Sequence, residues 1–165
     1  MLRSHRAAAF SLAAVLVLAL APAVSQASTT VQISLWDQGA DVEMPTGLMY
    51  GMPGADLSKA PMGIKPSLNS APAGEVTFKV TNDSKDTIHE MIVVDVKEPG
   101  KPLPYNAGDQ RVDEEAAGDH GEVSELDPGK SGTLTVSLKP GSYLLICNIP
   151  GHYEAGMWTE FTVTP

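Results

Sequence analysis

The fold of this chain is constrained most by short runs in which apolar and polar residues alternate. Apolar side chains recur at every second position within residues 31–35, 76–80, 134–138 and 161–163. This period of two predicts strands that bury one face in a core and expose the other to water. Residues 88–96 and 143–146 are more continuously apolar, which predicts strands that are buried on both faces.

Turn residues separate these runs and indicate how the strands connect. Proline and glycine stand together at residues 99–100, 128–129 and 140–141. Several short strands without a helical period between them predict an all-β fold, an antiparallel β-sandwich. The methionine-rich residues 37–73 and the acidic residues 98–121 are expected to be loops with at most a short helical turn. Because such long excursions cannot be tight hairpins, we expect Greek-key connections.

The N-terminal residues have the pattern of a secretory signal peptide. Arg3 and Arg6 precede an uncharged apolar run at residues 7–21, and small and polar residues lead to Ala27. This order predicts a signal peptide, residues 1–27, that is cleaved after Ala27, and export to the periplasm. The expected mature chain, residues 28–165, has the length of one domain. An uncleaved membrane anchor is the alternative, although a bilayer span usually needs about 20 apolar residues.

The net charge limits which partners are expected. The whole chain carries −9 at pH 7, and the loss of Arg3 and Arg6 with the signal peptide would change this to −11. Such a surface repels nucleic acid and suits a protein partner with a basic patch. A simpler explanation is that acidity keeps an exported protein soluble, and this is compatible with binding to a basic partner. We expect a monomer without stable membrane insertion.

Cys147 is the only cysteine, so the chain forms no internal disulfide. Four residues separate Cys147 from His152, and four more separate His152 from Met157, while Pro150 and Gly151 supply a bend. One loop therefore offers a thiolate, an imidazole and a thioether that can converge on one point. Cys147 as a buried core thiol, as a catalytic thiol or as a zinc ligand are the alternatives; closed zinc sites usually lack methionine.

A fourth ligand must come from another part of the chain. His89 lies early in the apolar run 88–96, beside a turn, whereas His120 stands in the acidic excursion. Two histidines and a cysteine with a weak axial methionine are the donor set of a blue copper site. The sequence therefore predicts one type 1 copper ion at His89, Cys147, His152 and Met157. Because these ligands leave no position for a substrate, we expect electron transfer and no enzymatic activity.

The spacing of Cys147, His152 and Met157, with Ile-Pro-Gly-His at residues 149–152, resembles the ligand loop of cupredoxins, and is most similar to rusticyanin and sulfocyanin. The resemblance covers residues 75–165 well and residues 31–37 as a first strand. It implies the same four copper ligands, an electron exit near His152, and redox partners such as cytochromes or copper oxidases. Glu90 departs from the family, in which a small polar residue often follows the first histidine.

A second function stays open at this point. Thioethers are soft ligands for Cu(I), and Met44, Met49, Met52 and Met62 all lie in residues 37–73. With His120, they would suit a periplasmic protein that stores, delivers or tolerates copper. Methionines that only fill gaps under a long loop are the simpler explanation. A copper-free interaction domain on the same scaffold is a third possibility.

Overall fold

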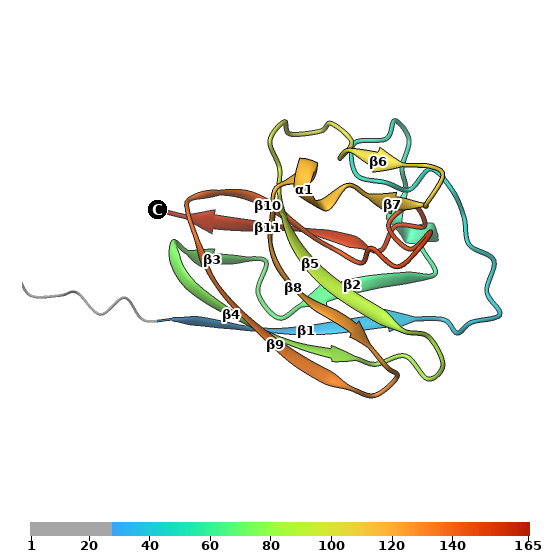
Figure 1. Ribbon diagram of the computed structural model, residues 1–165, viewed down its shortest axis with the longest axis horizontal. Coiled ribbons are helices and arrows are strands. Elements are labelled where there is room, and N and C mark those ends of the chain that lie inside the picture. The colour runs from blue at the N-terminus through green and yellow to red at the C-terminus, as the bar shows by residue number, and fades with distance from the viewer. Residues whose placement is uncertain (1–27) are drawn as a thin grey trace, which may run out of the picture.

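Two β-sheets face each other across a buried apolar layer in the computed structural model, which describes residues 28–165 (Figure 1). The first sheet has the strand order β2-β1-β4-β9, formed by Met62–Pro66, Thr29–Asp37, Gly74–Asn82 and Ser131–Leu138. The second has the order β3-β11-β10-β5-β8, formed by Ser70–Pro72, Trp158–Thr164, Gly141–Ile146, His89–Asp95 and Asp119–Leu126. The predicted all-β sandwich is thus confirmed.

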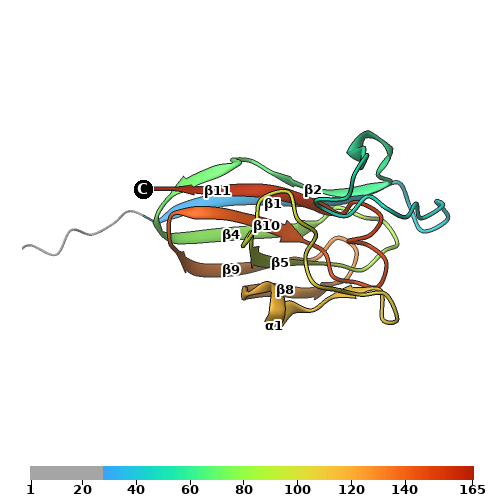
Figure 2. The same ribbon diagram turned by 90° about the horizontal axis from the view of Figure 1, so that it is seen from above.

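The smaller elements belong to the two long excursions. The first excursion contains the 3-10 helix η1 (Leu57–Lys59), and the second contains the short strands β6 (Tyr105–Asn106) and β7 (Arg111–Val112) and the one-turn helix α1 (Glu114–Ala117). Both views place the η1 region, the β6–β7 segment and the loop between β10 and β11 at the end of the sandwich opposite the C-terminus (Figures 1 and 2). No helix within residues 28–165 is long and apolar enough to cross a membrane.

Two apolar clusters explain the two sequence patterns. The cluster between the sheets takes alternate residues of β1 and β4, such as Val31, Leu35 and Phe78, as the period of two predicts. The second cluster lies on the other face of β5 and β10, where Ile92, Leu144 and Ile146 pack against Tyr50, Leu103, Val112 and Tyr153 from the excursions and the loop after β10. Residues 89–94 of β5 are therefore buried on both faces, which confirms most of the prediction for residues 88–96, whereas Ile88 is 42% exposed.

The structure corrects two expectations about connectivity. Residues 62–66 and 70–72, expected to be loop, form β2 and β3, and residues 119–121 of the second excursion begin β8. The sandwich is also not wholly antiparallel, because β1 pairs in parallel with β4, and β11 pairs in parallel with β3. Parallel neighbours require a long crossover, and the residues between β1 and β4 provide it for the first pair. The predicted signal peptide lies outside the described residues.

Candidate metal centre

Three of the four predicted ligands meet at one buried point. His89 Nδ1 lies 3.2 Å from His152 Nδ1, and Cys147 Sγ lies 3.4 Å from His152 Nδ1 and 3.9 Å from His89 Nδ1. His89 and Cys147 are fully buried, and His152 is 7% exposed. We call these three residues the ligand cluster. Within residues 28–165, they are the only group of three or more His, Cys, Asp or Glu side chains whose donor atoms come this close together.

Backbone hydrogen bonds fold residues 147–157, here called the ligand loop, back on itself. Cys147 follows β10 directly, and its N–H donates to the carbonyl of Met157 at 3.0 Å. The N–H of Met157 donates in turn to the carbonyl of His152 at 3.0 Å. Met157 is fully buried in the cluster between the sheets, together with Cys147. The backbone of Met157, the fourth predicted ligand, is therefore hydrogen-bonded to the backbones of the other two loop ligands.

Both excursions brace the ligand loop from outside. The N–H of Gly151 donates to the carbonyl of Gln110 at 2.9 Å, and the N–H of Leu48 donates to the carbonyl of Glu154 at 3.0 Å. Gly156 has φ +96°, and a Cβ there would lie 2.9 Å from the Ala60 Cβ. Glycine therefore fits this position for its backbone conformation and for the close approach of the first excursion.

A carboxylate orients His89 from the side opposite the ligand cluster. The Oδ2 atom of Asp37, at the end of β1, lies 2.7 Å from His89 Nε2, and the Asp37 side chain is only 3% exposed. Burial raises the pKa of Asp37, but hydrogen bonds with Ser84, His89, Gly39 and Thr87 outweigh it and lower the pKa overall. With an ionised Asp37, the proton of a neutral His89 lies on Nε2, so the Nδ1 lone pair faces the cluster. No pattern in the sequence predicts this contact, which joins residues 52 positions apart.

The donor atoms fit a single metal ion. A triangle with the three measured sides has its centre about 2 Å from each corner, which is close to a metal–nitrogen bond length. Burial raises the pKa of Cys147 to about 12, so the thiol is protonated without a metal, and a metal must displace that proton. The Glu90 N–H lies 3.5 Å from Sγ, in position to donate to it. Two imidazoles and a thiol with a neighbouring buried methionine form the donor set of a type 1 copper site.

Both histidines are neutral in this centre. Burial lowers the pKa of His152 to about 4, with a further contribution from His89. Burial also lowers the pKa of His89, although the contact with Asp37 opposes this effect. Neutral imidazoles are the form that binds metals. Both imidazoles can therefore bind a metal cation without first losing a proton.

Glu90, the residue that departs from the family pattern, is also buried, at 4% exposure. Its Oε1 atom has no hydrogen-bond partner among the described residues. Burial and the charges of Glu122 and Glu114 raise the Glu90 pKa to about 7, although Arg111 opposes this. The ionised carboxylate also contributes to the high pKa of Cys147, so its charge reaches the centre.

The other candidate ligands do not join the ligand cluster. His120 Nε2 pairs with Asp95 Oδ1 at 2.8 Å, and its ring lies edge-on to Tyr143. Met62 packs in the cluster between the sheets, Met49 packs against the second cluster, and Met44 is 39% exposed. Met49 and Met62 therefore belong to different packing environments.

The acidic residues of the second excursion have partly local roles. Asp113 caps α1 by accepting a hydrogen bond from the Ala116 N–H at 3.0 Å. Glu114 accepts one from the side chain of Asn148 at 2.7 Å. Asp113, Glu115 and Asp119 are exposed. These acidic residues therefore form a solvated surface, and Asp113 and Glu114 also make structural contacts.

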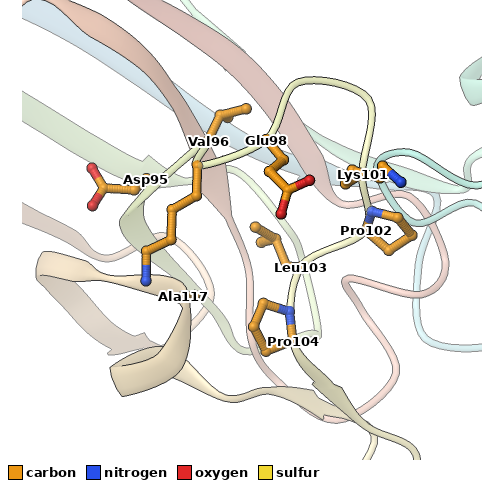
Figure 3. Close-up of a pocket in the computed structure, with 9 residues that line it drawn as sticks. Asp95, Val96, Glu98, Lys101, Pro102, Leu103, Pro104 and Ala117 are labelled. Carbon is orange, nitrogen blue, oxygen red and sulfur yellow. The ribbon is translucent and has the colours of Figure 1, made fainter.

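A pocket near α1 contains none of the residue types that form the ligand cluster. It is lined by Asp95, Val96, Glu98, Lys101, Leu103 and Ala117 among others, and Figure 3 shows carboxylates and prolines around the apolar Leu103. None of its lining residues is a histidine, cysteine or methionine. This pocket therefore adds no histidine, cysteine or methionine ligand to those of the ligand cluster.

Comparison with known proteins identifies one matching family and relatives that match over only part of their length. Residues 71–165 match the model of the sulfocyanin (SoxE) domain. Auracyanin-B of Chloroflexus aurantiacus is 54% identical over 41 residues, and the copper-resistant cuproprotein CopI of Pseudomonas aeruginosa is 49% identical over 41 residues. Each match covers 24% of this chain, but only 17% and 23% of these relatives' own lengths.

Among solved structures, rusticyanin from Thiobacillus ferrooxidans aligns with a TM-score of 0.52 at 19% identity. The alignment covers 84% of this chain and 79% of rusticyanin. At this identity, the similarity establishes a shared fold. It confirms the cupredoxin-like sandwich that the sequence predicts.

Proposed function

This chain belongs to the sulfocyanin (SoxE) domain family of cupredoxins, and from that premise we propose that it is a single-electron carrier with one copper ion bound by His89, Cys147, His152 and Met157. The observation that carries the proposal is the convergence of two Nδ1 atoms and one Sγ atom, all within 3.9 Å of one another. Copper bound there would supply a one-electron couple whose potential depends on the axial ligand.

The protein's contribution to electron transfer is to hold the ligands still. His89 stands at the start of β5, while the other three ligands share one loop that both excursions brace. Ligands fixed in this way keep their positions when an electron arrives or leaves, so the reorganisation energy of electron transfer stays small. The centre is buried and His152 is its most exposed ligand, at 7%. His152 is therefore the proposed point of electron exit.

The proposed setting is the periplasm, and the proposed partners are larger redox proteins of the cytochrome or copper oxidase type. Support for export comes from the N-terminal sequence pattern. Support for a basic partner comes from the charge of −11 that residues 28–165 carry at pH 7. Charge complementarity of this kind mainly accelerates association and is weakened by salt.

Copper handling is the second candidate function, and the partial similarity to CopI favours it. Met49 and Met62 belong to different apolar clusters. This favours the electron carrier over a second Cu(I) site that joins these two thioethers. The two candidates predict different copper stoichiometries.

A copper titration of the purified protein, followed in the visible spectrum, tests the proposal. One tight equivalent with an intense blue band supports the electron carrier. Two or more equivalents, one of which disappears when Met44, Met49 and Met52 are replaced by leucine, would favour copper handling. A protein that stays colourless and binds no copper would contradict both functions and leave a copper-free interaction domain.

A further inference from the structure

Asp37 is a carboxylate that is buried beside the metal centre, a position that folding does not require. A carboxylate at the end of an interior strand, with a side chain only 3% exposed, loses most of its hydration. Burial of a charge in this way is costly unless hydrogen bonds replace the lost water. The structure supplies several of these, and one of them comes from a residue of the ligand cluster.

Fixed donors hold both oxygens of Asp37. Oδ1 accepts a hydrogen bond from the N–H of Gly39 at 2.9 Å, and Oδ2 lies 2.7 Å from His89 Nε2. The hydroxyl of Ser84 also hydrogen-bonds to this carboxylate. The Oγ of Ser84 itself accepts from the N–H groups of Asp86 and Thr87, at 3.2 and 2.9 Å, so its proton remains available to donate.

The turn that carries these donors is fixed by Asn82. Its side chain donates to the carbonyls of Thr87 and Leu126 and accepts from the N–H of Ser84. Hydrogen bonds between the Asn82 side chain and backbone groups therefore hold the turn that contains Ser84 and precedes His89. Asp37, Ser84 and His89 form one preorganised unit that exists without a metal.

We infer that Asp37 is a positioning residue of the metal centre, which fixes the Nε2–H tautomer of His89 and stabilises the oxidised metal ion through its negative charge. Metal-binding histidines commonly donate their second N–H to a carboxylate, which orients the ring and makes the ligand more basic. An anion beside the ligand favours the higher positive charge of Cu(II) over Cu(I). Removal of this anion therefore raises the reduction potential. The inference rests on the proposed copper function.

Three variants separate orientation from charge. Asp37→Asn keeps an oxygen that can accept from His89 but loses the charge, whereas Asp37→Ala loses both. Asp86→Asn is the matched control, because Asp86 is exposed, lies in the same turn and accepts from the N–H of Ala40 without contacting the ligand cluster.

Voltammetry of the copper-loaded proteins measures the effect of charge. We expect Asp37→Asn to shift the Cu(II)/Cu(I) equilibrium at least tenfold toward Cu(I), which is a rise of about 59 mV for one electron. We expect Asp37→Ala to shift the potential at least as far and to weaken copper binding by about 10- to 100-fold. The Asp86→Asn shift should be much smaller. An equal shift in Asp86→Asn, or an unchanged potential in both Asp37 variants, overturns the inference.

Nitrogen-15 NMR of the imidazoles, in the metal-free and the Cu(I) proteins, provides a reading independent of potential. Wild type should show His89 protonated at Nε2, and Asp37→Ala should show a mixture of tautomers in the metal-free form. A wild-type protein with His89 protonated at Nδ1 overturns the tautomer assignment. A wild-type protein that takes up no copper overturns the proposed function instead, while the metal-free spectrum still reports on the Asp37–His89 contact.

Discussion

The side chain of Asn148 hydrogen-bonds to both backbone polar groups of Val112. Its Oδ1 accepts from the Val112 N–H at 2.6 Å, and its Nδ2 donates to the Val112 carbonyl at 3.0 Å. Asn148 is 1% exposed and directly follows Cys147, while Val112 lies in β7 of the second excursion. This contact therefore ties the ligand loop to a segment 36 positions away.

Replacement of Asn148 by alanine should destabilise the protein without removing the metal centre. The change leaves the backbone groups of Val112 buried and unpaired, which costs about 1–3 kcal/mol. We expect the free energy of unfolding to fall by about 2–3 kcal/mol in chemical denaturation. Asn106→Ala is the control, because Asn106 is exposed and bonds within its own turn. Equal stability of the two variants would show that the Asn148 contact is unimportant.

Replacement of Cys147 by serine should abolish the blue colour completely. The intense band of such a centre arises from charge transfer between thiolate sulfur and copper, and a hydroxyl oxygen cannot supply it. The measurement is the visible spectrum after addition of Cu(II), with circular dichroism to verify folding. A folded Cys147→Ser protein that is still blue would refute the ligand assignment.

Replacement of Met157 by leucine should keep the blue band but raise the reduction potential. The thioether is a weak axial donor, and its loss removes stabilisation of Cu(II). We expect a rise of about 60 mV or more, a tenfold change in the one-electron equilibrium. Met49→Leu is the matched control, because Met49 packs against the second apolar cluster. An unchanged potential in Met157→Leu would count against an axial role.

The two strand histidines should respond differently to replacement by alanine. His89→Ala removes a donor from the ligand cluster, so the blue band should disappear and copper affinity should fall. His120→Ala should leave the spectrum unchanged, because His120 contacts Asp95 and Tyr143 and lies outside the cluster. Loss of the band in His120→Ala would show that the wrong histidine was assigned.

Glu90 should make the stability of the metal-free protein depend on pH. Its pKa is about 7 in the folded state, against an ordinary value of 4.5. Between these pH values the folded state binds more protons than the unfolded state, so the free energy of unfolding falls as the pH rises from about 4.5 to about 7. The fall attributable to Glu90 is at most about 3 kcal/mol and levels off at higher pH.

Glu90→Gln isolates this contribution, because glutamine has the same shape and does not titrate. The histidines oppose the Glu90 effect, since their lowered pKa values reduce stability as the pH falls below about 6.5. The relevant quantity is therefore the stability difference between Glu90→Gln and wild type. We expect this difference to increase between about pH 4.5 and pH 7, and a difference that is constant with pH would contradict the raised Glu90 pKa.

Local patterns in the sequence determined much of the fold and of the centre. The alternation in β1 and β4 follows from a strand that buries one face, and the continuous apolar run of β5 follows from burial on both faces. The ligand loop could be identified because its three candidate ligands are separated by only ten positions. His89 could be selected because it begins a buried strand, and it lies in the ligand cluster.

Short strands with weak patterns were not predictable. In β2, Met62, Gly63 and Ile64 are all buried and show no alternation, and β3 has only three residues. Their strand conformation results from pairing with β1 and β11, which supply the hydrogen-bonding partners. A strand of this length is defined by its neighbours rather than by its own residue preferences.

The sequence by itself determined which residues can bind a metal, because donor chemistry and close spacing are properties of the chain. Only the tertiary structure decided what surrounds those donors. Asp37 reaches His89 across 52 positions, and Asn148 reaches Val112 across 36. Such contacts depend on which strands become neighbours and on which excursions cover them. The free energy that selects this arrangement comes from burial of the two apolar clusters as a whole, so the residues that make a contact do not reveal it by themselves.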